Sequence, residues 1–171
     1  LFIEANLMKG SERVKITGQL GEVMRESAEI GISYMRANAS SLGIDLKKYE
    51  KSDLHIHVPD GATPKDGPSA GLAITTAIIS LYTKNPVNKD VAMTGEISLR
   101  GKALEIGGLR EKIIAAQKAG IKTVIIPHDN IKDLAEIPKE VVDSLDIRPV
   151  KHIDEVLEIA LKNKIRGGKK V

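Results

Sequence analysis

PKDGPSAGLAITTAIISL, the segment at residues 64–81, joins a loop rich in proline and glycine to a run of mostly apolar residues. Over residues 69–82 apolar side chains occur on almost every side of a helix, which predicts that this helix is buried inside the fold. Gly67 and Pro68 interrupt regular structure before it, so Ser69 stands where the loop turns into the helix. A core helix that begins at a rigidly held serine is therefore the predicted centre of the domain.

The composition is typical of a globular domain with a substantial core. The chain has 171 residues, of which 42% are hydrophobic and 29% are charged, and its net charge is +3. Aromatic residues make up only 2%, so stacking platforms for single-stranded nucleic acid are nearly absent and nucleic acid is not the expected partner. Zero cysteine excludes disulfides, a thiolate metal site and a cysteine nucleophile, and it fits the reducing cytoplasm that we expect.

The ends of the chain carry few signals. No run reaches the length of a membrane span and the start has no charged leader, so neither a span nor a signal peptide is predicted. A first residue other than Met is consistent with a fragment of a longer protein. We expect one domain over residues 1–163 and a basic, flexible tail over residues 164–171.

The periodicity of the chain predicts alternating strands and helices in a single α/β (α+β) domain with a mixed sheet. Residues 1–7 and 13–17 are predicted to form an N-terminal β-hairpin around a turn at residues 9–11. Further strands are expected at residues 53–58, 91–97, 99–106, 122–126 and 146–150, with 91–97 and 99–106 paired. Helices are expected at residues 20–42, 69–82, 109–118, 131–134, 139–145 and 154–162.

Ser69 has two interpretations. The first is an ordinary serine at the cap of a helix. The second is a nucleophile, because small Ala70 and Gly71 leave room for a substrate backbone. Free N–H groups and the positive dipole at a helix start would then stabilise an oxyanion on the attacked carbonyl.

A serine nucleophile requires a base, and histidine is one candidate. Either His55 or His57 could serve with a carboxylate such as Asp60 or Asp66. The simpler account is that His55 and His57 line a half-buried strand face and make structural hydrogen bonds. The pair also has a spacing seen at zinc sites, but without cysteine or a clear third ligand no metal site is expected.

Lysine is the other candidate base. Lys112 lies in the first turn of the helix that follows Gly107 and Gly108, beside apolar Ile113. Desolvation and the positive helix terminus both favour an uncharged amine there. Lys65 lies in an open loop and is expected to stay charged, although most lysines in a first helical turn also face solvent.

Four segments together resemble the proteolytic domain of the ATP-dependent Lon protease in its A-type form. In chain order they are HIHVP at 55–59, GATPKDGPSAG at 61–71, MTGE at 93–96 and GGLREK at 107–112. The resemblance covers almost the whole chain and implies a serine endopeptidase in which Ser69 is the nucleophile and Lys112 the general base. It also implies that Thr94 helps to hold the lysine. Arg110 stands where relatives usually carry Lys, a change that we expect to be tolerated because it keeps the charge.

The resemblance also implies features outside these residues. The chain lacks a GxxxxGK(S/T) loop, so ATP and Mg²⁺ are expected at an upstream ATPase module and no cofactor is expected in this domain. The expected substrates are unfolded or damaged proteins, and the expected role is protein quality control. The expected assembly is a homo-oligomeric ring of six copies. Backbone N–H groups at Gly67 to Ala70, around Pro68, are expected to stabilise the oxyanion, and Asp66 is a candidate latch on Lys112 in a closed site. A non-catalytic assembly module and a Ser-His esterase that uses His57 are the alternatives.

Overall fold

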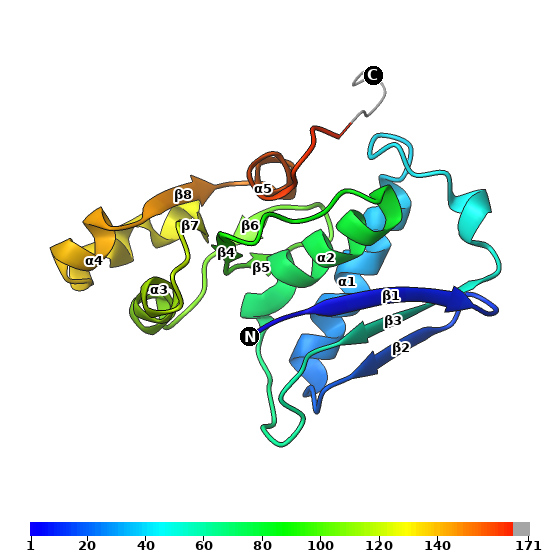
Figure 1. Ribbon diagram of the computed structural model, residues 1–171, viewed down its shortest axis with the longest axis horizontal. Coiled ribbons are helices and arrows are strands. Elements are labelled where there is room, and N and C mark those ends of the chain that lie inside the picture. Colours follow the sequence, from blue (N-terminus) through cyan, green and yellow to red (C-terminus); the bar gives the residue numbers. More distant parts are fainter. Residues whose placement is uncertain (166–171) are drawn as a thin grey trace.

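A three-stranded sheet forms one side of the molecule in the computed structural model, which describes residues 1–165 (Figure 1). Its strand order is β1-β3-β2, with β1 at Glu4–Lys9, β2 at Val14–Thr17 and β3 at Ser52–His57. β1 runs antiparallel to β3, whereas β2 runs parallel to it. Most of the tail expected at residues 164–171 lies outside the described residues.

The N-terminal β-hairpin predicted from the sequence is wrong, because β3 lies between β1 and β2. The carboxylate of Asp53 at the start of β3 explains the arrangement. It accepts hydrogen bonds from the N–H groups of Ser11 at 2.7 Å and of Arg13 at 2.9 Å. These bonds hold the turn around the end of the inserted strand, so the two flanking strands pair with β3 and not with each other.

A second, parallel sheet has the order β4-β7-β8. β4 is Val91–Met93, β7 is Thr123–Pro127 and β8 is Asp146–Val150. A separate antiparallel pair consists of β5 at Glu96–Ile97 and β6 at Ala103–Leu104. The strand expected at residues 91–97 is therefore divided: its first part belongs to the parallel sheet, and only its last part pairs with the next strand along the chain.

The helices lie close to their expected positions, and the described chain is one compact α/β domain with mixed sheets. Each helix within residues 1–165 is too short or too polar to span a lipid bilayer. The α-helices are α1 at Glu22–Ala37, α2 at Gly71–Thr83, α3 at Leu109–Lys118, α4 at Lys139–Asp143 and α5 at Ile153–Ala160. Shorter 3₁₀ segments lie at Leu46–Tyr49, Pro68–Ala70 and His128–Glu136.

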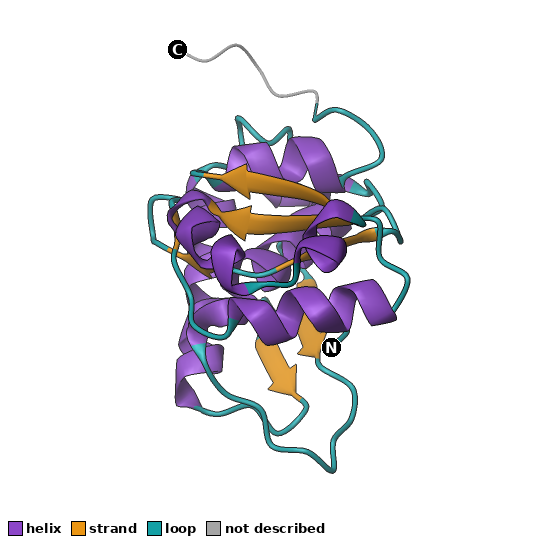
Figure 2. Cartoon of the chain, turned by 90° about the vertical axis from the view of Figure 1, so that its left-hand side faces the viewer, coloured by secondary structure: helices purple, strands orange, loops and turns teal. Residues whose placement is uncertain are grey.

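Two hydrophobic clusters lie on opposite faces of the parallel sheet. β7 contributes to both, because successive side chains of a strand point to opposite faces. Ile125 packs into the larger cluster, which contains most of buried α2, and Val124 and Ile126 pack into the smaller one with the apolar face of α3. Figure 2 views the molecule from the side on which α3 and α4 lie in Figure 1.

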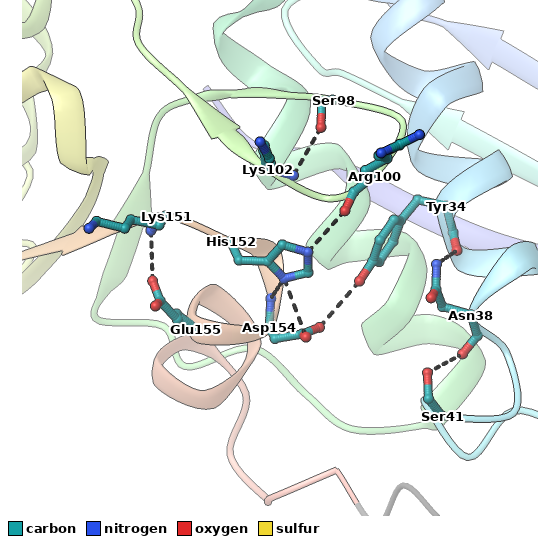
Figure 3. Close-up of polar contacts among 10 residues, drawn as sticks. All are labelled: Tyr34, Asn38, Ser41, Ser98, Arg100, Lys102, Lys151, His152, Asp154 and Glu155. Atoms are coloured by element: carbon teal, nitrogen blue, oxygen red, sulfur yellow. Dashed lines mark hydrogen bonds and ion pairs between the residues drawn. The ribbon is translucent and has the colours of Figure 1, made fainter. Parts of the chain in front are cut away.

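A polar cluster fixes the β5–β6 turn to the start of α5 (Figure 3). His152 contacts the carbonyl of Arg100 through Nε2 at 2.9 Å and accepts the N–H of Asp154 at Nδ1. The Tyr34 hydroxyl donates to Asp154 at 3.2 Å; burial, and then the charge of that carboxylate, raises the pKa of Tyr34. Gly101 passes directly against this cluster with φ +82°.

Candidate active site

Ser69 and Lys112, far apart in the sequence, meet in the structure. Ser69 lies in the 3₁₀ turn that leads into α2, and Lys112 lies in the first turn of α3. The lysine Nζ is 3.2 Å from the serine Oγ, and both residues are half-buried. Because a hydroxyl can donate as well as accept, this distance also suits an uncharged amine that takes the hydroxyl proton.

The backbone of Ser69 is fixed to the carboxyl end of β4. Its carbonyl accepts the N–H of Gly95 at 2.8 Å, and the Gly95 carbonyl accepts the N–H of Leu72 at 3.0 Å. Gly95 has φ +156°, and a Cβ there would overlap the Leu72 side chain, so a larger residue does not fit. The serine is thus held by hydrogen bonds between main-chain groups as well as by the buried helix behind it.

Thr94 is buried beside this connection. The resemblance implied that its hydroxyl holds Lys112, but in the structure the hydroxyl donates to the carbonyl of Ser69 over 3.4 Å. The Thr94 N–H donates to the carbonyl of Ile125 in β7 at 3.1 Å. Thr94 therefore links the serine, and not the lysine, to the parallel sheet.

Asp66 is the side chain whose surroundings differ most from expectation. One carboxylate oxygen accepts the N–H of Met24, the third residue of α1, at 2.9 Å and the N–H of Gly67 at 2.8 Å. A Cβ at Gly21, which precedes α1, would overlap the other oxygen. Free N–H groups and the positive dipole at a helix start attract a carboxylate, so Asp66 caps α1. Among residues 1–165 no ion pair joins it to Lys112, and the expected latch is absent from this structure.

The histidines of β3 do not form a triad with the serine. The hydroxyl of Thr17 lies between them, 2.8 Å from Nε2 of His55 and 2.7 Å from Nδ1 of His57. Within the described part of the chain, Ser69 is not a hydrogen-bond partner of either ring. This arrangement matches the structural role for the pair, and no group of three or more His, Cys, Asp or Glu residues there could hold a metal ion.

Asn130 is a site residue that the sequence analysis missed. It is fully buried in the 3₁₀ segment after β7. Its Oδ1 accepts the N–H of Ile106 at 3.0 Å, and its Nδ2 donates to the carbonyl of Ile106 at 2.8 Å and to Asp133 at 2.6 Å. Ile106 directly precedes the two glycines that lead into α3. An asparagine in a polar segment has no sequence signal that separates this role from that of an ordinary surface residue.

The turn that directly precedes α3 is exposed, whereas Ser69 and Lys112 are half-buried. A Cβ at Gly107 would meet nothing within 4 Å, and Gly108 is also exposed. A groove of about 450 Å³ lies elsewhere, between β2 and α1, and neither Ser69 nor Lys112 lines it.

A serine at a helix start with a lysine amine in hydrogen-bond range is the arrangement required by serine hydrolases that use a lysine base. The chain belongs to the family of Lon protease (S16) C-terminal proteolytic domains, whose family model matches residues 1–163.

Individual relatives agree with this assignment. The chain is 56% identical to the Lon protease of Escherichia coli (strain K12) over 167 residues, which are 98% of this chain and 21% of that protein. It is 58% identical to the Lon protease of Haemophilus influenzae over 167 residues, again 98% of this chain and 21% of the relative. For the Lon protease of Brevibacillus choshinensis the identity is 52% over 170 residues, 99% of this chain and 22% of the relative. The chain thus spans about a fifth of the length of these curated relatives.

Proposed function

We propose that this domain is a serine endopeptidase in which Ser69 is the nucleophile and Lys112 the general base. The observation that carries the proposal is the distance of 3.2 Å between the lysine Nζ and the serine Oγ. Membership of a family of proteolytic domains supports peptide cleavage as the reaction.

The reaction has two halves. The uncharged amine of Lys112 takes the proton of the Ser69 hydroxyl while Oγ forms a bond to the peptide carbonyl carbon, and the carbonyl electron pair moves to its oxygen. When this intermediate collapses, the C–N bond breaks and the lysine ammonium gives its proton to the departing amine. The product is a serine ester of the acyl fragment. The same amine then takes a proton from water while the water oxygen bonds to the ester carbon; the C–Oγ bond breaks, the ammonium gives that proton to Oγ of Ser69, and the acyl fragment leaves as a carboxylic acid.

The main-chain N–H of Ser69 is suited to the oxyanion. Ser69 lies in the 3₁₀ turn Pro68–Ala70 that leads into α2, and its N–H comes too early in that turn to have a partner within it, whereas the Ala70 N–H faces the Gly67 carbonyl in the same turn. The N–H of Gly67 already donates to Asp66, and Pro68 has no N–H to offer. The oxyanion site is therefore narrower than the stretch from Gly67 to Ala70 that the sequence suggested.

A larger assembly belongs to the same proposal. Since the chain spans about a fifth of the length of its relatives, we place the ATPase module, with its ATP and Mg²⁺, in a longer protein of which this domain is one part. In that protein a ring of six copies would receive unfolded polypeptide, and this domain would cleave it in the cytoplasm.

Covalent labelling tests the proposal. A fluorophosphonate, which forms a stable phosphonyl ester with an activated serine, should label Ser69, as located by mass spectrometry of the digested protein. Ser69→Ala should abolish labelling, and Lys112→Met should slow it by at least about 100-fold, the low end of what a general base contributes. Lys118→Met, on the last turn of the same helix and exposed, should label at the wild-type rate.

Each alternative function has its own signature in this experiment. A Ser-His hydrolase would lose labelling in His57→Ala and keep it in Lys112→Met. A non-catalytic assembly module would show no labelling of Ser69 in the wild-type chain.

A further inference from the structure

Asn130 makes a two-point clamp on one residue of another segment. It binds both the N–H and the carbonyl of Ile106, as a neighbouring strand would, at 3.0 and 2.8 Å. The second Nδ2 proton goes to Asp133, so both ends of this fully buried amide are engaged. A buried amide with such complete partners holds its target in one position, because any shift would leave polar groups unpaired.

The segment that Asn130 holds leads directly to Lys112. Ile106 is followed by Gly107 and Gly108, an exposed turn against which little else packs. The first hydrogen bond of α3, from the Lys112 N–H to the Gly108 carbonyl, is long at 3.4 Å. The start of α3 therefore depends on the clamp before it and on the apolar contacts of its inner face.

Ser69 and Lys112 are fixed to the same sheet by different tethers. The serine is fixed at the end of β4 through Gly95 and Thr94, and Asn130 extends from the end of β7 toward the lysine segment. The two helices also belong to different hydrophobic clusters, α2 mainly to the larger one and α3 to the smaller one. Their relative position is thus not set by packing against each other within one core.

We propose that Asn130 is a positioning residue that sets the place of the Lys112 amine relative to the Ser69 hydroxyl. This inference rests on the proposed Ser-Lys function. The distance of 3.2 Å is already at the long end of the hydrogen-bond range, so a further displacement removes the contact. A displacement of about 1 Å at a catalytic group can reduce the rate by about 100-fold.

Asn85 provides a matched control, because it makes the same kind of clamp away from α3. Its Oδ1 accepts the N–H of Asn163 at 3.0 Å, and its Nδ2 donates to the Asn163 carbonyl at 2.6 Å. It is also buried, at 7% exposure. Asn85→Ala and Asn130→Ala thus remove the same two-point contact, and only the second one lies on the route to Lys112.

The experiment measures saturation labelling of Ser69 by the fluorophosphonate, which separates the maximal labelling rate from the probe affinity, together with the urea midpoint of each variant. Asn130→Ala should lower the maximal rate by at least about tenfold with little change in affinity. Asn85→Ala should lose similar stability and keep the wild-type rate.

A second variant covers the case in which Asn130→Ala does not fold. In the double variant Asn130→Asp with Asp133→Asn, the carboxylate at 130 still accepts the Ile106 N–H and can pair with the new amide. The other carboxylate oxygen then faces the Ile106 carbonyl where an N–H donated before, so the clamp is broken on that side and the maximal rate should fall below that of the wild type.

The outcomes distinguish the two proposals. A wild-type maximal rate in folded Asn130→Ala, or in the double variant, would overturn the positioning role while labelling of Ser69 still supported the dyad. An equal loss of rate in Asn85→Ala would show a general effect of stability and would overturn it too. Absence of labelling in the wild-type chain would remove both proposals.

Discussion

Replacement of Asp66 separates a helix cap from a latch. In the structure this carboxylate accepts two main-chain N–H groups, one from the first turn of α1 and one from Gly67. A latch on Lys112 would make its removal activating. A cap would make the same removal destabilising, and it would loosen the loop that carries Ser69.

The magnitude follows from the two contacts. Loss of a side-chain acceptor at a helix N-terminus costs about 1 kcal/mol, within a range of about 0.5–2 kcal/mol. The second contact, from the N–H of half-buried Gly67, adds about 0.5 kcal/mol, the low end for one hydrogen bond. Asp66→Ala should therefore lower the free energy of unfolding by about 1.5 kcal/mol. Asp66→Asn keeps an acceptor oxygen and loses only the charge at the helix terminus, so it should lower the free energy of unfolding by about 0.3–1 kcal/mol.

Urea unfolding, monitored by circular dichroism, measures the free energies of unfolding of both Asp66 variants. Fluorophosphonate labelling of Ser69 measures how each variant changes the reactivity of the serine. Asp60→Asn is the matched control, because Asp60 lies in the same loop and is also exposed, its side chain is not the partner of α1, and Asn tolerates its φ of +71°. If Asp66→Asn has wild-type stability and labels faster than Asp60→Asn, the capping argument is refuted and the latch is restored.

Three further predictions follow from single contacts. Gly95→Ala should destabilise the fold by at least about 1 kcal/mol, since its Cβ would overlap Leu72 at a positive φ; thermal unfolding measures the loss. Gly101→Ala should separate the β5–β6 turn from His152, whose Nε2 would lie 2.7 Å from the new Cβ, and should shift the imidazole NMR signals of His152. The N–H groups of Arg13 and Ser11 lower the pKa of Asp53 in the folded protein below its ordinary value of 3.8. The stability that Asp53 contributes is therefore fully present above pH 3.8, and it is lost as the pH falls through the lowered pKa of the folded protein. Asp53→Asn should therefore flatten the acid limb of a plot of melting temperature against pH, and an unchanged acid limb would contradict this assignment.

The helices were predicted well because the spacing of apolar residues within one segment is enough to indicate a helix. The apolar run at residues 72–81 predicted the buried helix at residues 69–82, close to α2, and the glycines at 107 and 108 predicted the start of α3. Strand pairing failed where it depended on distant residues. The turn after β1 has the composition of a hairpin, but Asp53 binds its N–H groups and places β3 between the two strands.

The same distinction applies to the site. The resemblance pointed to Ser69 and Lys112, which the structure brings together. Thr94 and Asp66 also lie near the serine, but their actual partners are main-chain groups. A motif records which residue types occur near a site, whereas the identity of an N–H or carbonyl partner depends on how distant segments are folded around them. Asn130 belongs to the same class, since its partner is the main chain of Ile106.

These main-chain partners have one architectural cause. In a parallel sheet the carboxyl ends of neighbouring strands meet at one edge, and the chain leaves each strand there with unpaired polar groups. At this edge Thr94 follows β4 and Asn130 follows the end of β7, and each satisfies the main chain of a segment that carries one member of the pair. The lysine and the serine therefore need no direct contact between α2 and α3 to be placed, because each segment is held to the sheet. On this reasoning, substitutions at the sheet edge should change the separation of the pair more than substitutions on the outer face of α3, even where the loss of stability is the same.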